Sequence, residues 1–286
     1  MKGEHHIRLL CEVLGVSRSG YYRWLTAKPS ARAKRDTELA DKIIGFHAKS
    51  RGNYGAPRIL RDLKEAGIDT SEKRCARLMN ERGIRGRKKH RRKPRTTDSR
   101  HTQPIAPNVL ALLERPTAAN QVWVTDITYL ETGEGWLYLA AILDAFSRRI
   151  VGWACAPTLA AILVIAAWRD AVARRKPSPG LLHHSDRGCQ YVEQSFVLEL
   201  EQLGIARSMS RAGNCYDNAM MESFWSTVKT ETGLDITIPA TRREAELAVF
   251  DYIETFYNPT RRHSSLGYLS PVAFEKQQTK QHIKAA

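Results

Sequence analysis

The segment QVWVTDITYL, residues 121–130, alternates bulky apolar side chains with polar ones and is rich in β-branched residues. This pattern predicts a β-strand. The segments 135–149 and 150–156 predict two further strands, so the three together predict an antiparallel meander. Asp126 stands in the middle of the first strand, where a carboxylate is costly to bury unless it is paired or bound to a metal.

Downstream of the meander, helices alternate with strands. The apolar pattern predicts helices over 158–174, 192–204 and 217–232, and short strands over 181–186 and 205–210. Three antiparallel strands followed by alternating helices and strands is the element order of an RNase H-like core. The sequence therefore predicts an α/β fold of that class.

The region upstream of residue 121 predicts helices. Residues 5–25 predict two short helices around a turn at Gly15, with Ser17 as the N-cap of the second helix. This is the length and rhythm of a helix-turn-helix, whose second helix usually enters a major groove. Residues 36–83 continue as helices. The apolar face of the first helix is predicted to consist of Leu9, Leu10, Val13 and Leu14.

These patterns divide the 286-residue chain into five segments. They are a helix-turn-helix segment (1–30), a helical region (31–84), a basic linker that contains prolines (85–118), an RNase H-like core (119–235), and a C-terminal helix and tail packed on that core (236–286).

The charge of the chain points to a polyanionic partner. Its 45 Lys and Arg residues outnumber its 30 Asp and Glu residues, which gives a formal net charge of +15. Such a surface attracts nucleic acid. The segment RGRKKHRRKPR, residues 85–95, contains eight Lys and Arg residues and no acid. Such a run is typical of a solvated linker, and a flexible basic linker can also bind phosphates, so the two interpretations are compatible.

Candidate DNA contacts lie in four places. For one of them, the turn Arg261-Arg262-His263, exposure of the side chains to solvent is as good an interpretation as contact with DNA. The candidates are Arg18, Tyr21 and Arg23 on the second helix; Arg85, Arg87, Lys88, Lys89, Arg91, Arg92 and Lys93 in the basic segment; Lys229 on the helix of residues 217–232; and Arg261 and Arg262 in the tail.

Three acids can be brought together by this fold. Asp186 ends the short strand LLHHSD, at the kind of strand end where ligands collect in α/β folds, and Glu222 lies on the helix that follows, 36 positions later. With Asp126 they match a D…D-x35-E spacing. Phosphodiester cleavage can be driven by two divalent ions about 3.5–4 Å apart, and such hard ions take oxygen ligands. We therefore interpret Asp126, Asp186 and Glu222 as both catalytic residues and metal ligands.

Two further residues bear on this site. Lys229 follows Glu222 by seven residues, which is two helical turns, so both side chains lie on one face. Asp144 is a fourth candidate acid, but its neighbours Ser147 and Arg148 indicate a local cap or an ion pair instead.

Long strings of the sequence resemble the orfB-type transposases of the IS-three insertion-sequence group, within the retroviral-integrase superfamily. They are WVTDITYL, LDAFSRRIVGW, HSDRGCQY, SRAGNCYDNAMMESFWSTVKTE, YNPTRRHSSLGYLSPVAFE and, nearer the N-terminus, GNYGAPRIL and SEKRCARLM. The resemblance implies that Asp126, Asp186 and Glu222 form the catalytic triad. It further implies near-site positions at Asn214, Asp217, Asn218 and Lys229. The same resemblance implies that the helical region (31–84) is a DNA-binding region and that the RNase H-like core (119–235) is a catalytic core.

The resemblance also implies the reaction and its partners. One element end is nicked to free a 3′-hydroxyl, which then attacks beside the other end. Two Mg²⁺ ions are expected as cofactors, with Mn²⁺ as a possible substitute. The expected partners are double-stranded DNA at the element ends and the target, further copies of the chain in a homo-oligomer, and an upstream-frame protein or a fusion to it.

Two alternatives stay open at this stage. The first is a DNA-binding regulator without chemistry, which the helix-turn-helix and the basic segment would also suit. The second is a structure-specific nuclease of the same fold, which lacks the joining step.

Other residue types indicate no further chemistry. The five cysteines form no C-x-x-C pair, which argues against a zinc site. Of His183 and His184, one is expected to pack in a strand and the other to face out. Core packing is expected for most tryptophans, and base stacking is the alternative for Trp225. The tryptophans considered are Trp123, Trp136, Trp153, Trp168 and Trp225.

The chain shows no pattern of membrane insertion or secretion. The most apolar run, 159–168, is too short to span a bilayer, and the N-terminal residues contain no apolar stretch typical of a signal peptide. We expect a cytoplasmic, nucleoid-associated bacterial protein.

Overall fold

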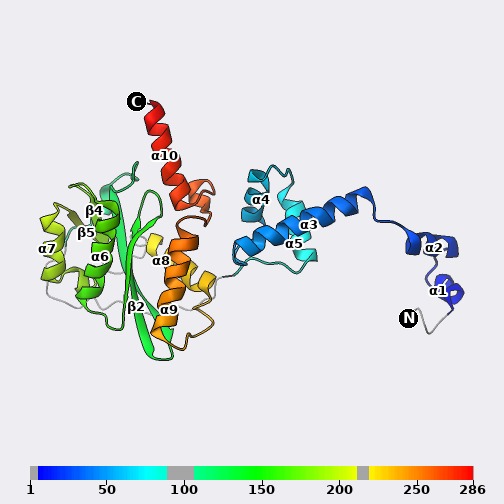
Figure 1. Cartoon of the computed structure of the whole chain (residues 1–286), viewed down its shortest axis with the longest axis horizontal. Helices are drawn as coiled ribbons and strands as arrows, with labels where there is room; N and C mark the ends of the chain where they lie inside the picture. The colour runs from blue at the N-terminus through cyan, green and yellow to red at the C-terminus, as the bar shows by residue number, and fades with distance from the viewer. Residues whose placement is uncertain (1–5, 89–105, 211–218, 286) are drawn as a thin grey trace. The chain divides into compact units, whose positions relative to one another are not determined.

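Two compact units make up the chain, Met1–Gly86 and Arg87–Ala286 (Figure 1). The structure, a computed structural model, describes residues 6–88, 106–210 and 219–285. The boundary between the units falls inside the segment that the sequence predicts as a linker. No helix in the described ranges is long and apolar enough to cross a membrane.

The N-terminal unit is helical, as predicted. Ser17 caps the second helix: its side-chain oxygen accepts a hydrogen bond from the Gly20 amide at 3.0 Å, which confirms the predicted N-cap. Ile43 of the third helix and Ile59 and Leu63 of the fourth are fully buried. The helices are α1 (Ile7–Val13), α2 (Arg18–Thr26), α3 (Ala31–Lys49), α4 (Ala56–Glu65) and α5 (Glu72–Glu81).

The apolar face predicted for the first helix is not covered. Leu9, Val13 and Leu14 are 54%, 76% and 68% exposed, and Cys11 is the buried residue of α1. The reason is size: α1 and α2 contain seven and nine residues, too few to cover each other's apolar side chains.

The C-terminal unit is built on a five-stranded sheet of order β3-β2-β1-β4-β5. Strands β1, β2 and β3 form the predicted antiparallel meander, and β4 and β5 run parallel to β1 and to each other. This order confirms the predicted RNase H-like α/β fold. The strands are β1 (Val122–Thr132), β2 (Gly135–Asp144), β3 (Ile150–Ala156), β4 (Leu182–Ser185) and β5 (Ala206–Met209).

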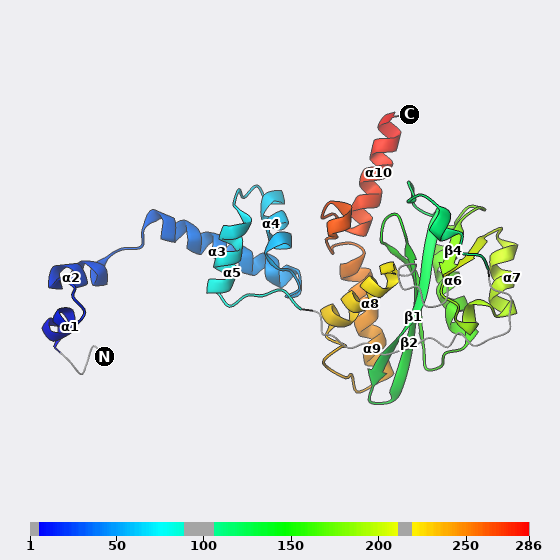
Figure 2. The ribbon, with the colours of Figure 1, turned by 180° about the vertical axis from the view of Figure 1, so that it is seen from behind.

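Helices cover both faces of the sheet. Helices α6 and α7 lie on one face, and α8 and α9 lie on the other (Figure 2). The main helices of this unit are α6 (Ala161–Arg175), α7 (Gln194–Gln202), α8 (Ala219–Thr232), α9 (Arg242–Phe250) and α10 (Pro271–Ala285). Shorter turns are η1 (Leu110–Leu112), η2 (Cys189–Tyr191), the π-helical η4 (Asp251–Tyr257) and η5 (Ser264–Leu266).

Aromatic side chains dominate the core between the sheet and α6 and α7. The rings of Trp123 and Trp168 meet edge to face at 5.6 Å, and both side chains are fully buried, as predicted. Trp136 is instead 49% exposed, because it stands next to the β1–β2 turn, where its ring packs edge-on against Tyr129.

Both histidines of β4 are buried, so the prediction that one faces out is wrong. His183 and His184 are 2% and 0% exposed. Strand β4 lies between β1 and β5. His183 packs against Trp168 of α6 and Phe196 of α7 on one face of the sheet. His184 is hydrogen-bonded to Ser208 of β5, whose Oγ atom accepts hydrogen bonds from the backbone amides of residues 109 and 110, so the chain before η1 covers this side of the strand.

Candidate active site

The parallel pairing of β1 with β4 bears on the position of two of the three predicted acids. Val122 pairs with Leu182 and Val124 with His184. These pairs end two residues before Asp126 on β1 and two residues before Asp186, which directly follows β4. Because the two strands are parallel, both acids come at the same end of the pair.

The pKa values of two phenols, the half-buried Tyr129 and the buried Tyr191, are affected by both acids. Burial raises the pKa of Tyr129, and the charges of Asp186 and Asp126 add to that rise. Burial likewise raises the pKa of Tyr191 well above its usual value, with Asp126 and Asp186 again contributing. Because charge effects of this kind fall off with distance, both carboxylates lie near the same end of the sheet.

The turn after β4 holds the second acid. The Asp186 Oδ1 atom accepts a hydrogen bond from the Gly188 amide at 2.9 Å. A Cβ atom on residue 188 would lie 3.1 Å from that same oxygen and 2.9 Å from the Gln190 Oε1 atom. A side chain at position 188 would therefore press on the Asp186 carboxylate and on the Gln190 side chain.

Helix α8 is joined directly to the first acid. The Trp225 Nε1 atom donates a hydrogen bond to the Asp126 Oδ2 atom at 2.9 Å, and the Trp225 residue is only 7% exposed. Base stacking by Trp225, the alternative considered from the sequence, is therefore wrong because the ring lies inside the protein. The three-residue spacing from Glu222 was the one signal that could have placed Trp225 at the site.

The other two predicted residues of α8 flank this tryptophan. Glu222 is exposed and precedes Trp225 by three residues, so their side chains lie on neighbouring positions of one helix face. Lys229 follows by four residues. Burial lowers the pKa of Lys229, while the charges of the Asp126 and Asp235 carboxylates act in the opposite direction.

The described residues do not form a closed metal cage. Nowhere in residues 6–88, 106–210 and 219–285 are three or more His, Cys, Asp or Glu side chains grouped so as to hold a metal ion. The structure thus brings Asp126 and Asp186 to the same end of a parallel strand pair but does not gather Glu222 into a ligand set with them. The predicted near-site residues Asn214, Asp217 and Asn218 lie outside the described residues.

Comparison with known proteins assigns the chain to a family. Residues 116–215 and 203–271 match families described as the integrase core domain, and residues 34–93 match an HTH-like domain. The chain is 47% identical over 278 residues to the insertion element IS600 uncharacterized 31 kDa protein of Shigella sonnei, covering 97% of this chain and all of that protein. It is 36% identical over 276 residues to transposase InsF for insertion sequence IS3A of Escherichia coli, covering 96% and 95% of the two chains.

The chain belongs to the transposases of the IS3 group.

A further relative is the transposase for insertion sequence element IS904 of Lactococcus lactis, which is 41% identical over 87% of this chain and 98% of that protein. Among solved structures, the HTLV-2 integrase catalytic core in complex with magnesium has a TM-score of 0.45 and 18% identity over 56% of this chain and 99% of that chain. The sequence relatives make this protein a DDE-type transposase that acts on DNA, rather than a regulator without chemistry.

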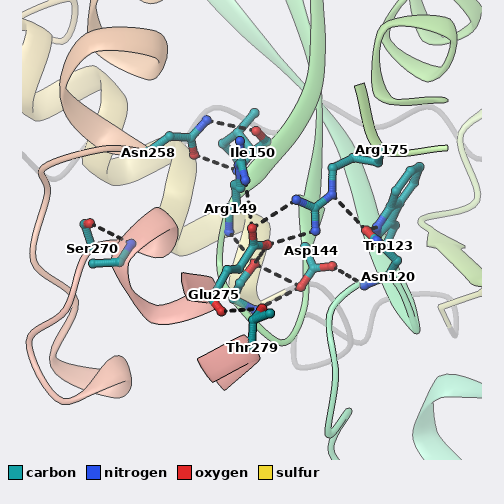
Figure 3. A network of polar contacts seen from close by, with 12 residues as sticks. Asn120, Trp123, Asp144, Arg149, Ile150, Arg175, Asn258, Ser270, Glu275 and Thr279 are labelled. Carbon is teal, nitrogen blue, oxygen red and sulfur yellow. Dashed lines mark hydrogen bonds and ion pairs between the residues drawn. The ribbon is translucent and has the colours of Figure 1, made fainter. Parts of the chain in front are cut away.

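Asp144 has the structural role that the sequence indicates. It is fully buried in the transposase, where its Oδ1 atom accepts hydrogen bonds from the amides of Phe146 and Ser147 and its Oδ2 atom accepts one from Asn120 (Figure 3). Burial raises the pKa of Asp144 above its usual value, although these hydrogen bonds act to lower it. The carboxylate caps the turn after β2, which is why that strand ends at residue 144 rather than 149.

A network of charged side chains beside Asp144 holds the C-terminal helix of the transposase. Glu275 on α10 pairs with Arg149 at 2.7 Å and with Arg175 of α6 at 2.9 Å (Figure 3). The side chains of Glu275 and Arg175 are 12% and 13% exposed, so these ion pairs are largely shielded from water.

Two predicted DNA contacts have partners within the transposase. Arg261 is buried and pairs with Glu231 through two hydrogen bonds of 2.7 and 2.8 Å, so its prediction as a DNA contact is wrong. The Arg87 Nη1 atom donates to the carbonyl oxygens of Thr230 and Glu231, at the C-terminal end of α8. A cation at this end of a helix also interacts favourably with the helix dipole.

The other candidate contacts differ in exposure. Arg18, Arg23, Arg85 and Lys88 are exposed, whereas Tyr21 is half-buried. Arg262 is half-buried and donates to the carbonyl oxygen of Tyr268. The remaining candidates, Lys89, Arg91, Arg92 and Lys93, lie outside the described residues.

Proposed function

We propose that the transposase cleaves and joins DNA strands at Asp126, Asp186 and Glu222. The observation that carries the proposal is the parallel pairing of β1 with β4, whose last pair, Val124 with His184, stands two residues before Asp126 and Asp186. Support for the third acid comes from α8, since the residue one turn after Glu222 is hydrogen-bonded to Asp126.

The donor set suits divalent magnesium. All three side chains offer carboxylate oxygens, which are the ligands that hard cations such as Mg²⁺ take in proteins. We propose two Mg²⁺ ions at these carboxylates, with Mn²⁺ able to replace them. When bound, such ions activate the attacking oxygen and stabilise the leaving one.

The chain's own residues contribute position and charge. The proposed reaction comprises hydrolysis that frees a 3′-hydroxyl at one element end, followed by attack of that hydroxyl beside the other end. Both steps are in-line displacements at phosphorus and require no covalent bond to the protein. Lys229 would direct its ammonium group at the phosphate of the bound strand, and Asn214, Asp217 and Asn218 would lie at the edge of the site.

DNA is held, in this proposal, by the exposed cations of the N-terminal unit and the basic segment. Arg18, Tyr21 and Arg23 would contact DNA from α2, and Arg262 from the tail. Arg85, Arg87, Lys88, Lys89, Arg91, Arg92 and Lys93 would bind phosphates. Cutting at one element end and joining at the other requires two active sites or two ends in one assembly, so we propose a homo-oligomer on DNA. An upstream-frame protein or a fusion to it would complete end recognition.

The test is strand nicking and joining on oligonucleotides that carry the element's ends, with Mg²⁺ or Mn²⁺. Asp126→Asn, Asp186→Asn and Glu222→Gln should each lower activity by more than about 100-fold, since even outer partners of metal ligands are worth 10–100-fold. Glu199→Gln on α7, which covers the opposite face of the sheet, is the matched control and should retain activity. Wild-type rates in Asp126→Asn and Glu222→Gln would refute the assignment.

A further inference from the structure

The indole of Trp225 makes a directional contact with a proposed metal ligand. Its Nε1–H group donates to the Asp126 Oδ2 atom at 2.9 Å. We propose that Trp225 is a positioning residue that sets the orientation of the Asp126 carboxylate and the approach of α8 to β1. This inference rests on the proposed function, because it assumes that Asp126 binds a cation.

The chemistry of the indole suits this role. An indole nitrogen only donates, and it carries no charge. It therefore orients the carboxylate without neutralising it, whereas an ammonium group such as that of Lys229 would compete with a cation for the same negative charge. A carboxylate has about four lone-pair positions, and the indole N–H group occupies one of them.

Packing keeps the indole in place. Trp225 is 7% exposed, and its ring lies 4.8 Å from that of Phe224. Phe224 packs in turn edge-to-face against Tyr257 at 5.0 Å, and both of these residues are buried. Because the buried indole is packed against Phe224, it has little rotational freedom, and its N–H group stays directed at Asp126.

The position of Trp225 along α8 gives the contact a second consequence. Glu222 lies one turn before it and Lys229 one turn after it. The hydrogen bond from Trp225 to Asp126 of β1 therefore fixes how closely α8 approaches the sheet, and with it the distance of Glu222 and Lys229 from the sheet. Loss of this hydrogen bond would therefore affect the positions of Glu222 and Lys229 together.

The decisive variant is Trp225→Phe, which keeps an aromatic ring and removes the donor. Mn²⁺ binding to the full chain without DNA, measured by calorimetry, should weaken by about 10–100-fold, the range seen when outer partners of metal ligands are removed. The kcat of strand cleavage should fall by a similar factor at a fixed Mn²⁺ concentration, while the KM for DNA stays unchanged.

Trp153→Phe is the matched control. The Trp153 Nε1 atom also donates to a carboxylate oxygen, Oε1 of Glu254, at the same 2.9 Å, but Glu254 is not one of the proposed ligands. This variant should bind Mn²⁺ as the wild type does. Equal weakening in Trp153→Phe and Trp225→Phe would mean that general destabilisation causes the effect, and it would overturn the inference.

Trp225→Gln separates the donor from the ring, because it restores an N–H group without aromatic packing. Mn²⁺ binding should be tighter in this variant than in Trp225→Phe, even where urea unfolding shows it to be less stable.

Asp126→Asn distinguishes the two proposals. Wild-type Mn²⁺ binding in Asp126→Asn would refute the proposed site itself, whereas loss in Asp126→Asn with full binding in Trp225→Phe would refute only the role of Trp225.

Discussion

Arg261 and Arg262 are neighbours in the tail, yet their guanidinium groups have different surroundings. The side chains of Arg261 and Glu231 are each only 7% exposed, and Tyr252 donates a further hydrogen bond to Glu231. Arg262 is half-buried and reaches a backbone carbonyl. Adjacent arginines therefore serve different purposes, and burial decides which one supports the end of α8.

Removing one partner of this buried pair should be costly. Arg261→Met leaves the Glu231 charge without its cation in a poorly solvated place, so we expect a loss of about 3–5 kcal/mol in the free energy of unfolding. Urea unfolding followed by circular dichroism measures this loss. The double variant Arg261→Met with Glu231→Leu should recover part of it, because neither charge is then buried alone.

An exposed arginine serves as the comparison. Arg243 pairs with Glu246 on α9, and its side chain is 70% exposed. Arg243→Met should change the free energy of unfolding by less than about 1 kcal/mol. A similarly small change in Arg261→Met would show that the Arg261 pair is solvated in solution.

At the scale of elements, the packing of α6 on β3 depends on one residue without a side chain. A Cβ atom on residue 152 would lie 2.5 Å from the backbone nitrogen of Ala171 and would also clash with the carbonyl of Ala167. The helix therefore lies directly on the strand at Gly152. The alanines at 167 and 171, both buried, allow the same close approach from the side of the helix.

Gly152→Ala should push α6 away from the sheet and destabilise the protein by about 1–3 kcal/mol, the usual cost of overpacking. Gly45→Ala is the matched control, since a Cβ atom there meets nothing within 4 Å. Because glycine is unfavourable inside a helix such as α3, Gly45→Ala should stabilise by about 0.5–1 kcal/mol. Thermal unfolding measures the change in stability of both variants. A Gly152→Ala variant as stable as the wild type would contradict the close packing of α6 on β3.

For the whole molecule, the formal charge of +15 dominates the interaction with DNA. The charge is concentrated in the basic segment of residues 85–95, which spans the boundary between the two units after Gly86. Binding of such a segment to DNA releases counterions from the phosphates, so the affinity depends steeply on salt.

We expect the logarithm of the DNA association constant to fall linearly with the logarithm of the salt concentration. Replacing Lys88, Lys89 and Arg91 by Gln should reduce the slope by about 0.9 for each phosphate that is no longer neutralised. Fluorescence anisotropy at several salt concentrations measures the slope. Arg169→Gln, which removes a cation already paired with Glu199, should leave it nearly unchanged, and an unaltered slope in the triple variant would exclude the basic segment from phosphate binding.

The local sequence pattern predicts helices and strands of this fold correctly. Strand β3 has the predicted bounds, Ile150–Ala156, and Ser17 caps α2 as expected. Both depend on nearest neighbours, namely the alternation of side chains along a strand and a hydroxyl three residues from an amide. Predictions failed where the answer depended on distant segments, as with the exposure of Trp136 and the burial of His184.

The candidate site divides in the same way. The sequence alone determined that three acids have the spacing of this family and that two of them lie on or just after strands. Only the tertiary structure decided that β1 and β4 pair in parallel, so that Asp126 and Asp186 come at the same end of the two strands, that Trp225 turns inward to the Asp126 carboxylate, and that Arg261 is enclosed with Glu231. The physical reason is that periodicity reports which face of an element is apolar, whereas register and burial depend on which other elements come to cover that face.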